Sequence, residues 1–118
     1  MKLMTKAIEK SLPPLYSQES NPDPQVVLHF FNPMGAGDWF ITEGQLEVFD
    51  KEEGDDEPIV VESWLFFGLC DLGFGYPELG YVSLVELESV KGPFGLGIER
   101  DMYWQPKALS EVRAKANA

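Results

Sequence analysis

The feature that most constrains this fold is the apolar stretch IVVESWLFFGL at residues 59–69. Valine, phenylalanine and tryptophan dominate it, and these residues fit the packed, pleated surface of a strand. An apolar run of this length without regular alternation is typical of a strand that is covered on both faces. The sequence therefore predicts a sheet in which residues 59–69 form an interior strand.

Shorter segments with alternating apolar residues predict the other strands of this sheet. These segments are residues 25–31, 39–48, 81–83 and 98–104. A kink is expected at Gly44, because a glycine inside a strand often marks a bulge. The predicted sheet is small and antiparallel, with four to five strands.

Three short helices are expected around the sheet. The first begins at Thr5 and stops before Pro13, because proline cannot continue a helix. The second begins at Ser83, which stands three residues before Glu86 as in a capping box. The third covers residues 105–118. Strands and short helices in this order predict the α+β class.

Length and composition set further bounds. The chain has 118 residues with 44% hydrophobic residues, which predicts one packed domain over 1–118. No apolar run approaches the roughly 18 residues that span a bilayer, and the start MKLMTKAIEK lacks the apolar core of a signal peptide. The single cysteine, Cys70, fits a reducing compartment. We therefore expect a cytoplasmic protein with no membrane contact.

The charge is concentrated in the middle of the chain. The net charge is −11, and residues 38–88 carry fourteen acidic residues against one basic residue, Lys51, a net −13. Such a surface repels phosphate backbones and attracts basic partners. We therefore expect a basic protein partner and no direct binding of nucleic acid.

The acidic residues are densest in the segment DKEEGDDEP at residues 50–58, which has six acids around Gly54. A charge block of this kind is usually a solvated hairpin tip. The alternative is a partner-binding acidic surface. Its candidate residues are Glu43, Glu47, Asp50, Glu52, Glu53, Asp55, Asp56, Glu57 and Glu62.

The stretch GPFGLGIERD at residues 92–101 has the glycine content of a phosphate-binding loop. Such a loop precedes a helix and offers free backbone amides, whereas this one follows a predicted helix and Pro93 lacks an amide hydrogen. We interpret the glycines as a structural turn. Glu99, Arg100 and Asp101 are interpreted as a structural ion-pair cluster, with acid–base chemistry as the alternative reading.

The remaining reactive residues do not form a recognisable motif. His29 has no cysteine or acidic neighbour at the spacing of metal ligands, and Asp71 beside Cys70 is expected to raise the pKa of the thiol. A Cys70–His29 pair remains open. Hydrolase, metalloprotease and nucleotide-binding motifs are not found in the sequence. We therefore expect no catalytic residues, metal site or cofactor, and a protein that is not an enzyme.

Three sequence segments resemble a known family. They are LPPLYSQE at residues 12–19, LFFGL at 65–69, and ELGYVSLVELESVKGPFGLGIERDMYWQPKALSEV at 78–112. Their order is similar to that of a small domain-of-unknown-function family carried by bacterial plasmids, integrative conjugative elements and phages. The resemblance implies a place among the accessory proteins of mobile elements, and it carries over no catalytic residue.

The implied habitat and the acidic charge together suggest a function. We expect an inhibitor of a host defence protein, of the antirestriction or anti-CRISPR type, whose carboxylates mimic DNA phosphates in the basic channel of a host nuclease or CRISPR effector. One alternative is an accessory binding module of plasmid maintenance or conjugation. Another is a small enzyme or ligand-binding domain that uses Glu99, Arg100 and Asp101.

Overall fold

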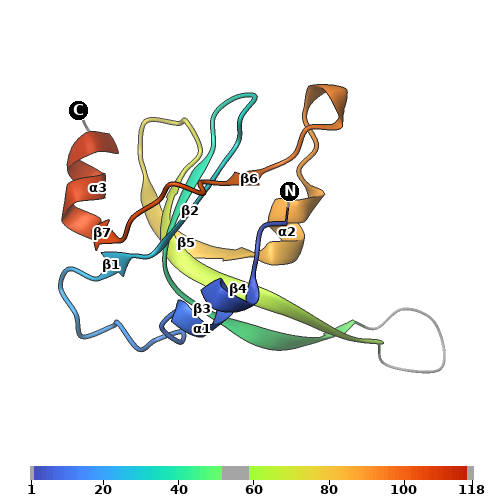
Figure 1. The fold of residues 1–118 in the computed structure, drawn as a ribbon, viewed down its shortest axis with the longest axis horizontal. Coiled ribbons are helices and arrows are strands. Elements are labelled where there is room, and N and C mark those ends of the chain that lie inside the picture. The colour runs from blue at the N-terminus through green and yellow to red at the C-terminus, as the bar shows by residue number, and fades with distance from the viewer. Residues whose placement is uncertain (1, 52–58, 117–118) are drawn as a thin grey trace.

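A five-stranded antiparallel sheet forms the centre of the molecule (Figure 1). The computed structural model describes residues 2–51 and 59–116. The strand order is β5-β4-β3-β2-β6. The strands are β2 (Leu28–Phe31), β3 (Asp38–Lys51), β4 (Ile59–Asp71), β5 (Glu78–Ser83) and β6 (Glu99–Arg100). A second, two-stranded sheet pairs β1 (Gln25–Val26) with β7 (Lys107–Ala108).

Three α-helices accompany the sheets in the described part of the chain. They are α1 (Lys6–Ser11), α2 (Leu84–Ser89) and α3 (Leu109–Ala116). The predicted α+β class is confirmed, as is an antiparallel sheet of about the expected size. None of the described helices is long and apolar enough to cross a bilayer.

The first two helices begin where their capping residues predict. The hydroxyl of Thr5 accepts a hydrogen bond from the amide of Ile8, which satisfies a free donor at the start of α1. At α2, the Ser83 hydroxyl accepts from the Glu86 amide while the Glu86 carboxylate accepts from the Ser83 amide. Both halves of the predicted capping box are therefore formed.

The third helix is shorter than the predicted segment 105–118. Lys107 and Ala108 form β7 instead, because they pair with Val26 and Gln25 of β1. Helix α3 then starts at Leu109, whose amide donates to the carbonyl of Pro24. A helix interpretation of the whole segment was wrong, since pairing with a distant strand overrides local propensity.

Two predicted strands also change in the structure. Segment 25–31 divides at Val27, whose amide still donates to the carbonyl of Ile41 in β3, because Gln25 and Val26 pair with β7 and so form the separate strand β1. Segment 98–104 keeps only Glu99–Arg100 as β6, because the chain turns directly afterwards. In β3 the register shifts between Ile41 and Glu43, which places the expected irregularity before Gly44.

The sheet is covered on both faces. On one face, Phe30, Ile41 and Phe66 are buried under α1, α2 and the N-terminal segment. On the other face, Leu69 packs with Val112 of α3 in a second cluster. The prediction that residues 59–69 lie in an interior strand is confirmed for 65–69, where β4 lies between β3 and β5, whereas 59–64 pair with β3 alone among the described strands.

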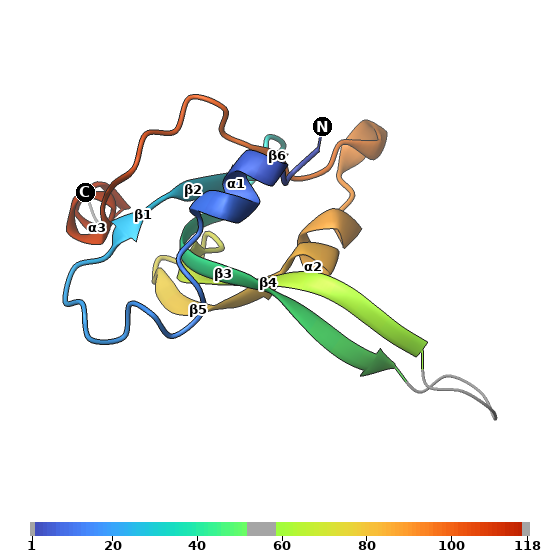
Figure 2. The same cartoon turned by 60° about the horizontal axis from the view of Figure 1, so that its bottom comes forward.

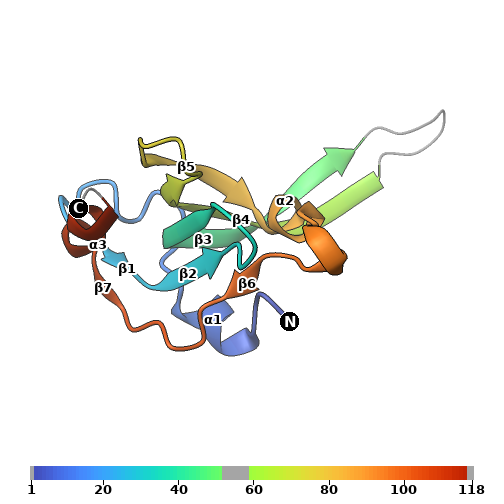
Figure 3. The ribbon, with the colours of Figure 1, turned by 90° about the horizontal axis from the view of Figure 1, so that it is seen from above.

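The outer halves of β3 and β4 extend beyond the rest of the sheet. β2 pairs with β3 over Asp38–Ile41, and β5 pairs with β4 over Leu65–Cys70. Residues 46–51 and 59–64 therefore pair with each other alone among the described strands, as a two-stranded ribbon. We call these residues the acidic arm. Figures 1 and 3 place it at one end of the molecule and α3 at the other.

Candidate functional site

The acidic arm has one face that contacts the core through Trp64 and exposes its other described side chains to water. Leu46 lies opposite Trp64, and Val48 lies opposite Glu62, so these four side chains share a face. Leu46 and Val48 are 49% and 58% exposed, and Glu62 is exposed. The arm therefore presents apolar side chains next to a carboxylate, and Figure 2 shows it projecting away from the body.

The predicted partner-binding acids lie in different places. Glu47 and Glu62 are on the arm, where the Gln45 side chain donates to the Glu47 carboxylate at 2.7 Å. The structure describes Asp50 by its backbone in β3 alone. Five of the predicted acids lie outside the described residues, in the segment that joins β3 to β4: Glu52, Glu53, Asp55, Asp56 and Glu57.

Glu43 does not belong to an exposed acidic surface. Its side chain is 4% exposed, and its carboxylate accepts hydrogen bonds from the amides of Tyr16 at 3.2 Å and Gln18 at 2.7 Å. Tyr16 has φ +69°, a left-handed conformation that few non-glycine residues adopt. Glu43 therefore holds a strained turn against β3, and the sequence interpretation of this residue as a surface acid was wrong.

Arg100 and Asp101 contact different parts of the fold, and Glu99 precedes them in β6. One guanidinium nitrogen of Arg100 donates to the carbonyls of Lys2 and Leu3, at 2.8 and 3.0 Å, and so ties the N-terminal segment to β6. Asp101 lies after the strand, and its carboxylate contacts His29. The described contacts of Arg100 and Asp101 hold distant segments together, which agrees with a structural role better than with one shared catalytic centre.

The sequence interpretation missed a cluster around His29. Its Nε2 atom lies 2.8 Å from an Asp38 carboxylate oxygen, and its Nδ1 atom lies 3.2 Å from Asp101. The ring stacks on Phe40 with a centroid distance of 4.6 Å and an interplanar angle of 6°, and Trp104 lies 5.1 Å away. A hairpin register that placed Phe31 opposite Asp38 would have revealed that His29 and Asp38 share a face.

The His29 cluster borders a cleft of about 270 Å³ on the α3 side of the sheet. The cleft is lined by aromatic, acidic and basic side chains, among them Trp104, Asp71 and Lys107. The Lys107 ammonium lies 4.5 Å from the Trp104 ring centroid, so this cation is already placed on the aromatic face. Because both ring nitrogens of His29 contact carboxylates, neither nitrogen is directed into the cleft as a free base.

The described residues support neither a metal-binding site nor a reactive thiol at Cys70. No group of three or more histidine, cysteine, aspartate or glutamate side chains there has the arrangement of a metal site. Burial, followed by the negative charge of Glu86, raises the pKa of the Cys70 thiol. The expected rise in pKa is therefore present, but its causes are burial and Glu86 rather than the neighbouring Asp71. His29 is bonded to two aspartates and does not activate Cys70.

A family model described as "Protein of unknown function (DUF2958)" matches residues 3–118. The chain belongs to the DUF2958 family. The resemblance to a domain-of-unknown-function family is thus confirmed at the level of the family. No match was found among the curated proteins or among the solved structures.

The DUF2958 description names no activity, so the chemistry of this member rests on its own surfaces. The His29 cluster is half-buried and its polar atoms contact one another. The acidic arm of this DUF2958 chain is more accessible, because Leu46, Val48 and Glu62 are exposed and the ribbon has no other strand against it among the described residues. The arm is therefore the stronger candidate for contact with another molecule.

Proposed function

We propose that this protein is a binding protein that docks its acidic arm into a positively charged groove on a protein partner. The partner class that fits best is a nuclease whose groove normally holds DNA, including restriction and CRISPR nucleases. The carboxylates of the arm take the place of DNA phosphates, so that docking blocks the nuclease. This proposal places the protein among inhibitors of host defence that mobile elements carry.

The observation that carries the proposal is the isolation of the arm. Residues 46–51 and 59–64 form a ribbon of two strands with no other strand against it in the described structure. A two-stranded ribbon by itself is marginally stable in water, and its open edges favour pairing with other chains. The ribbon contacts the core through Trp64, whereas its exposed side chains Leu46, Val48 and Glu62 support a role in contact with a partner.

The negative charge of the region indicates that the partner's surface is positively charged. Lys51 is the one basic residue in 38–88, and the segment joining β3 to β4 adds five acids between residues 52 and 57. Clustered carboxylates attract grooves lined by arginine and lysine, speed their association, and lose this effect at high salt. A DNA-binding groove is the kind of protein surface with the required density of positive charge.

The apolar side chains of the arm add to this attraction. Leu46 and Val48 expose about half of their surfaces beside Glu62. Apolar area that is removed from water stabilises a complex by roughly 25 cal/mol per Å² before the costs of association. The arm therefore offers both charge for steering and apolar surface for retention.

An inhibition assay tests the proposal. The purified protein is added to a panel of purified restriction and CRISPR nucleases from plasmid-bearing hosts, and DNA cleavage is followed at 50 and 500 mM salt. We expect inhibition of a member of the panel at low salt and at least tenfold weaker inhibition at high salt.

Two variants with equal net charge separate the arm from a general effect of acidity. One carries E52Q, E53Q, D55N and D56N in the segment that joins the two strands of the arm, and the other carries four body substitutions, E9Q, E19Q, E78Q and E111Q. The first is expected to lose inhibition, and the second to keep it. Equal inhibition by both variants, or inhibition of no nuclease, would overturn the proposal. An accessory binding module of conjugation is the interpretation that would then remain.

A further inference from the structure

The glycine-rich segment forms a tight turn that is closed by backbone contacts. Lys91 and Gly97 are bridged, the Gly92 amide donates to the Leu96 carbonyl at 2.6 Å, and the Leu96 amide donates to the Pro93 carbonyl at 3.3 Å. A Cβ atom on Gly92 would lie 3.2 Å from the Leu96 carbonyl oxygen. The glycine thus permits the two sides of the turn to approach each other.

Phe94 stands at the tip of this turn in an unfavourable backbone conformation. Its φ is +63° and ψ is +20°, and Gly95 follows with φ +73°. Two consecutive residues with positive φ correspond to a type I′ turn, in which asparagine, aspartate and glycine are preferred. Phenylalanine at this position costs free energy in the isolated protein.

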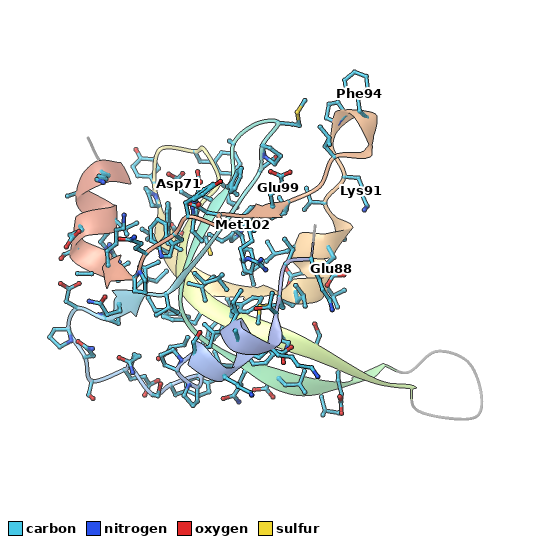
Figure 4. The ribbon with its side chains drawn as sticks, in the orientation of Figure 1. Asp71, Glu88, Lys91, Phe94, Glu99 and Met102 are labelled. Atoms are coloured by element: carbon cyan, nitrogen blue, oxygen red, sulfur yellow. The ribbon has the colours of Figure 1, made fainter. Side chains whose placement is uncertain are left out.

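The Phe94 side chain does not offset that cost within the fold. It is 96% exposed, so it contributes almost no burial of apolar area. Figure 4 shows it at the end of the turn, directed away from the body. A strained, exposed aromatic residue in a hydrogen-bonded turn is explained by contact with another molecule, because exposed aromatic side chains are typical anchors of protein interfaces.

The surface near Phe94 indicates the chemistry of that molecule. Figures 1–3 place the turn and the acidic arm at the same end of the molecule, with α2 between them. Helix α2 exposes Glu86 and Glu88 together with Val85, which is 55% exposed. The carboxylates of α2 outnumber the one exposed lysine at the base of the turn, Lys91, so the surface between the turn and the arm complements a basic protein and is repelled by anionic membranes.

We propose that Phe94 is an aromatic anchor that inserts into an apolar pocket on the same basic protein that receives the acidic arm. The inference rests on the proposed function and adds a second contact to it. The arm supplies attraction through charge, and Phe94 supplies apolar contact that persists at high salt.

Thermal unfolding tests whether Phe94 serves the fold. F94N replaces the residue by one that favours the observed backbone conformation, so the Tm is expected to rise by about 2–5 °C. F74N is the control, because Phe74 is also exposed, at 80%, but does not have positive φ. Its Tm is expected to change by less than about 1 °C. A fall in the Tm of F94N would show that Phe94 stabilises the fold and would overturn the proposal.

Site-specific crosslinking tests the contact. The photoreactive residue p-benzoyl-phenylalanine replaces Phe94, Val48 on the arm, or Phe74 in separate cultures. Phe74 lies in the loop between β4 and β5, on the side of the molecule away from the arm (Figures 1 and 3). The same basic protein should be crosslinked from positions 94 and 48 and not from position 74.

The other crosslinking outcomes are distinguishable. A lipid adduct, an adduct to a second copy of this chain, or a different protein at position 94 would overturn the anchor. A partner crosslinked at position 48 alone would also overturn it and would leave the proposed function intact. A basic partner crosslinked at position 94 alone would contradict the role of the arm instead. No adduct at either position would overturn both proposals.

Affinity for the purified crosslinked protein gives the final measurement. F94A is expected to weaken binding by at least tenfold, which is the size of effect that interface anchors show, and to weaken it at both low and high salt. F74A is expected to change affinity by less than twofold. Equal affinities of F94A and the unmodified protein would refute the anchor.

Discussion

The Nε2 atom of His29 lies 2.8 Å from the carboxylate of Asp38, and its Nδ1 atom lies 3.2 Å from Asp101. A neutral imidazole has one N–H group, and a carboxylate donates no hydrogen bond. The two contacts therefore become hydrogen bonds together only when one further proton is shared in the cluster. The cluster joins β2, β3 and the segment after β6. It is largely shielded from water, because the His29 side chain is only 13% exposed.

Removal of the imidazole is expected to weaken the fold. H29A loses two polar contacts and the stack on Phe40, and it leaves Asp38 and Asp101 without the group between them. The free energy of unfolding should fall by about 1–3 kcal/mol, as measured by urea denaturation. D101N keeps an oxygen acceptor and should cost less. A larger loss for D101N than for H29A would contradict this account.

The buried carboxylate of Glu43 is expected to hold the turn at Tyr16. E43A leaves the amides of Tyr16 and Gln18 without their acceptor, at a cost of about 2 kcal/mol. E43Q keeps one acceptor oxygen and should lose about half as much. Amide hydrogen exchange provides the local measurement, because faster exchange should appear at Tyr16 and Gln18 before other residues. Unchanged exchange at both amides in E43A would show that the carboxylate does not hold the turn.

Two paired glycines are expected to respond differently to alanine. A Cβ atom on Gly68 would lie 2.0 Å from the Phe40 carbonyl oxygen, a distance that the backbone of β3 cannot permit. Gly80 lies opposite Gly68 on β5 and has no neighbouring atom within 4 Å of its Cβ position. G68A should destabilise the protein by about 3 kcal/mol or prevent folding, and G80A should leave stability almost unchanged. Circular dichroism and thermal melts compare the two, and equal Tm values would contradict the register.

Asp23 is expected to make part of the protein's stability dependent on pH. Its carboxylate accepts hydrogen bonds from the hydroxyl and the backbone amide of Ser110 near the start of α3. These bonds, the one from the hydroxyl most strongly, lower the pKa of Asp23 in the folded state. A group whose pKa falls on folding stabilises the protein above its unfolded value of about 4, and this contribution is lost as the pH falls below that value. D23N should therefore have a lower Tm than the unmodified protein at pH 7. The difference should shrink toward pH 3, and a difference that grows toward low pH would refute the assignment.

Several elements were predictable because they depend on neighbouring residues. Ser83 and Glu86 are three positions apart, and a capping box needs no information beyond that spacing. The apolar stretch at 59–69 similarly predicted that residues 65–69 lie inside the sheet, although residues 59–64 extend beyond β5. β7 was not predictable in this way, because Lys107 is strand through pairing with Val26, 81 positions earlier in the chain.

In the candidate site, too, some features follow from the local sequence and others only from the pairing of distant strands. The acidic character of residues 50–58 is visible in the sequence, and it suggested a basic partner. The isolation of the arm was not visible, since it depends on where β2 and β5 stop pairing with β3 and β4. Phe94 was read as part of a glycine-rich turn, and its strain and exposure became evident only from its backbone angles and its position at the tip.

The sequence by itself determined the helix caps, the interior strand and the sign of the surface charge, because each depends on local spacing or on composition. The tertiary structure decided which carboxylates are exposed. Glu43 and Glu62 are both strand glutamates in an acidic region, yet Glu43 is buried against Tyr16 and Gln18 while Glu62 faces water. The physical reason is that burial and hydrogen bonding depend on which distant segment packs against a strand, and only the assembled sheet brings residues 16–18 to Glu43 and none of the described strands to the arm.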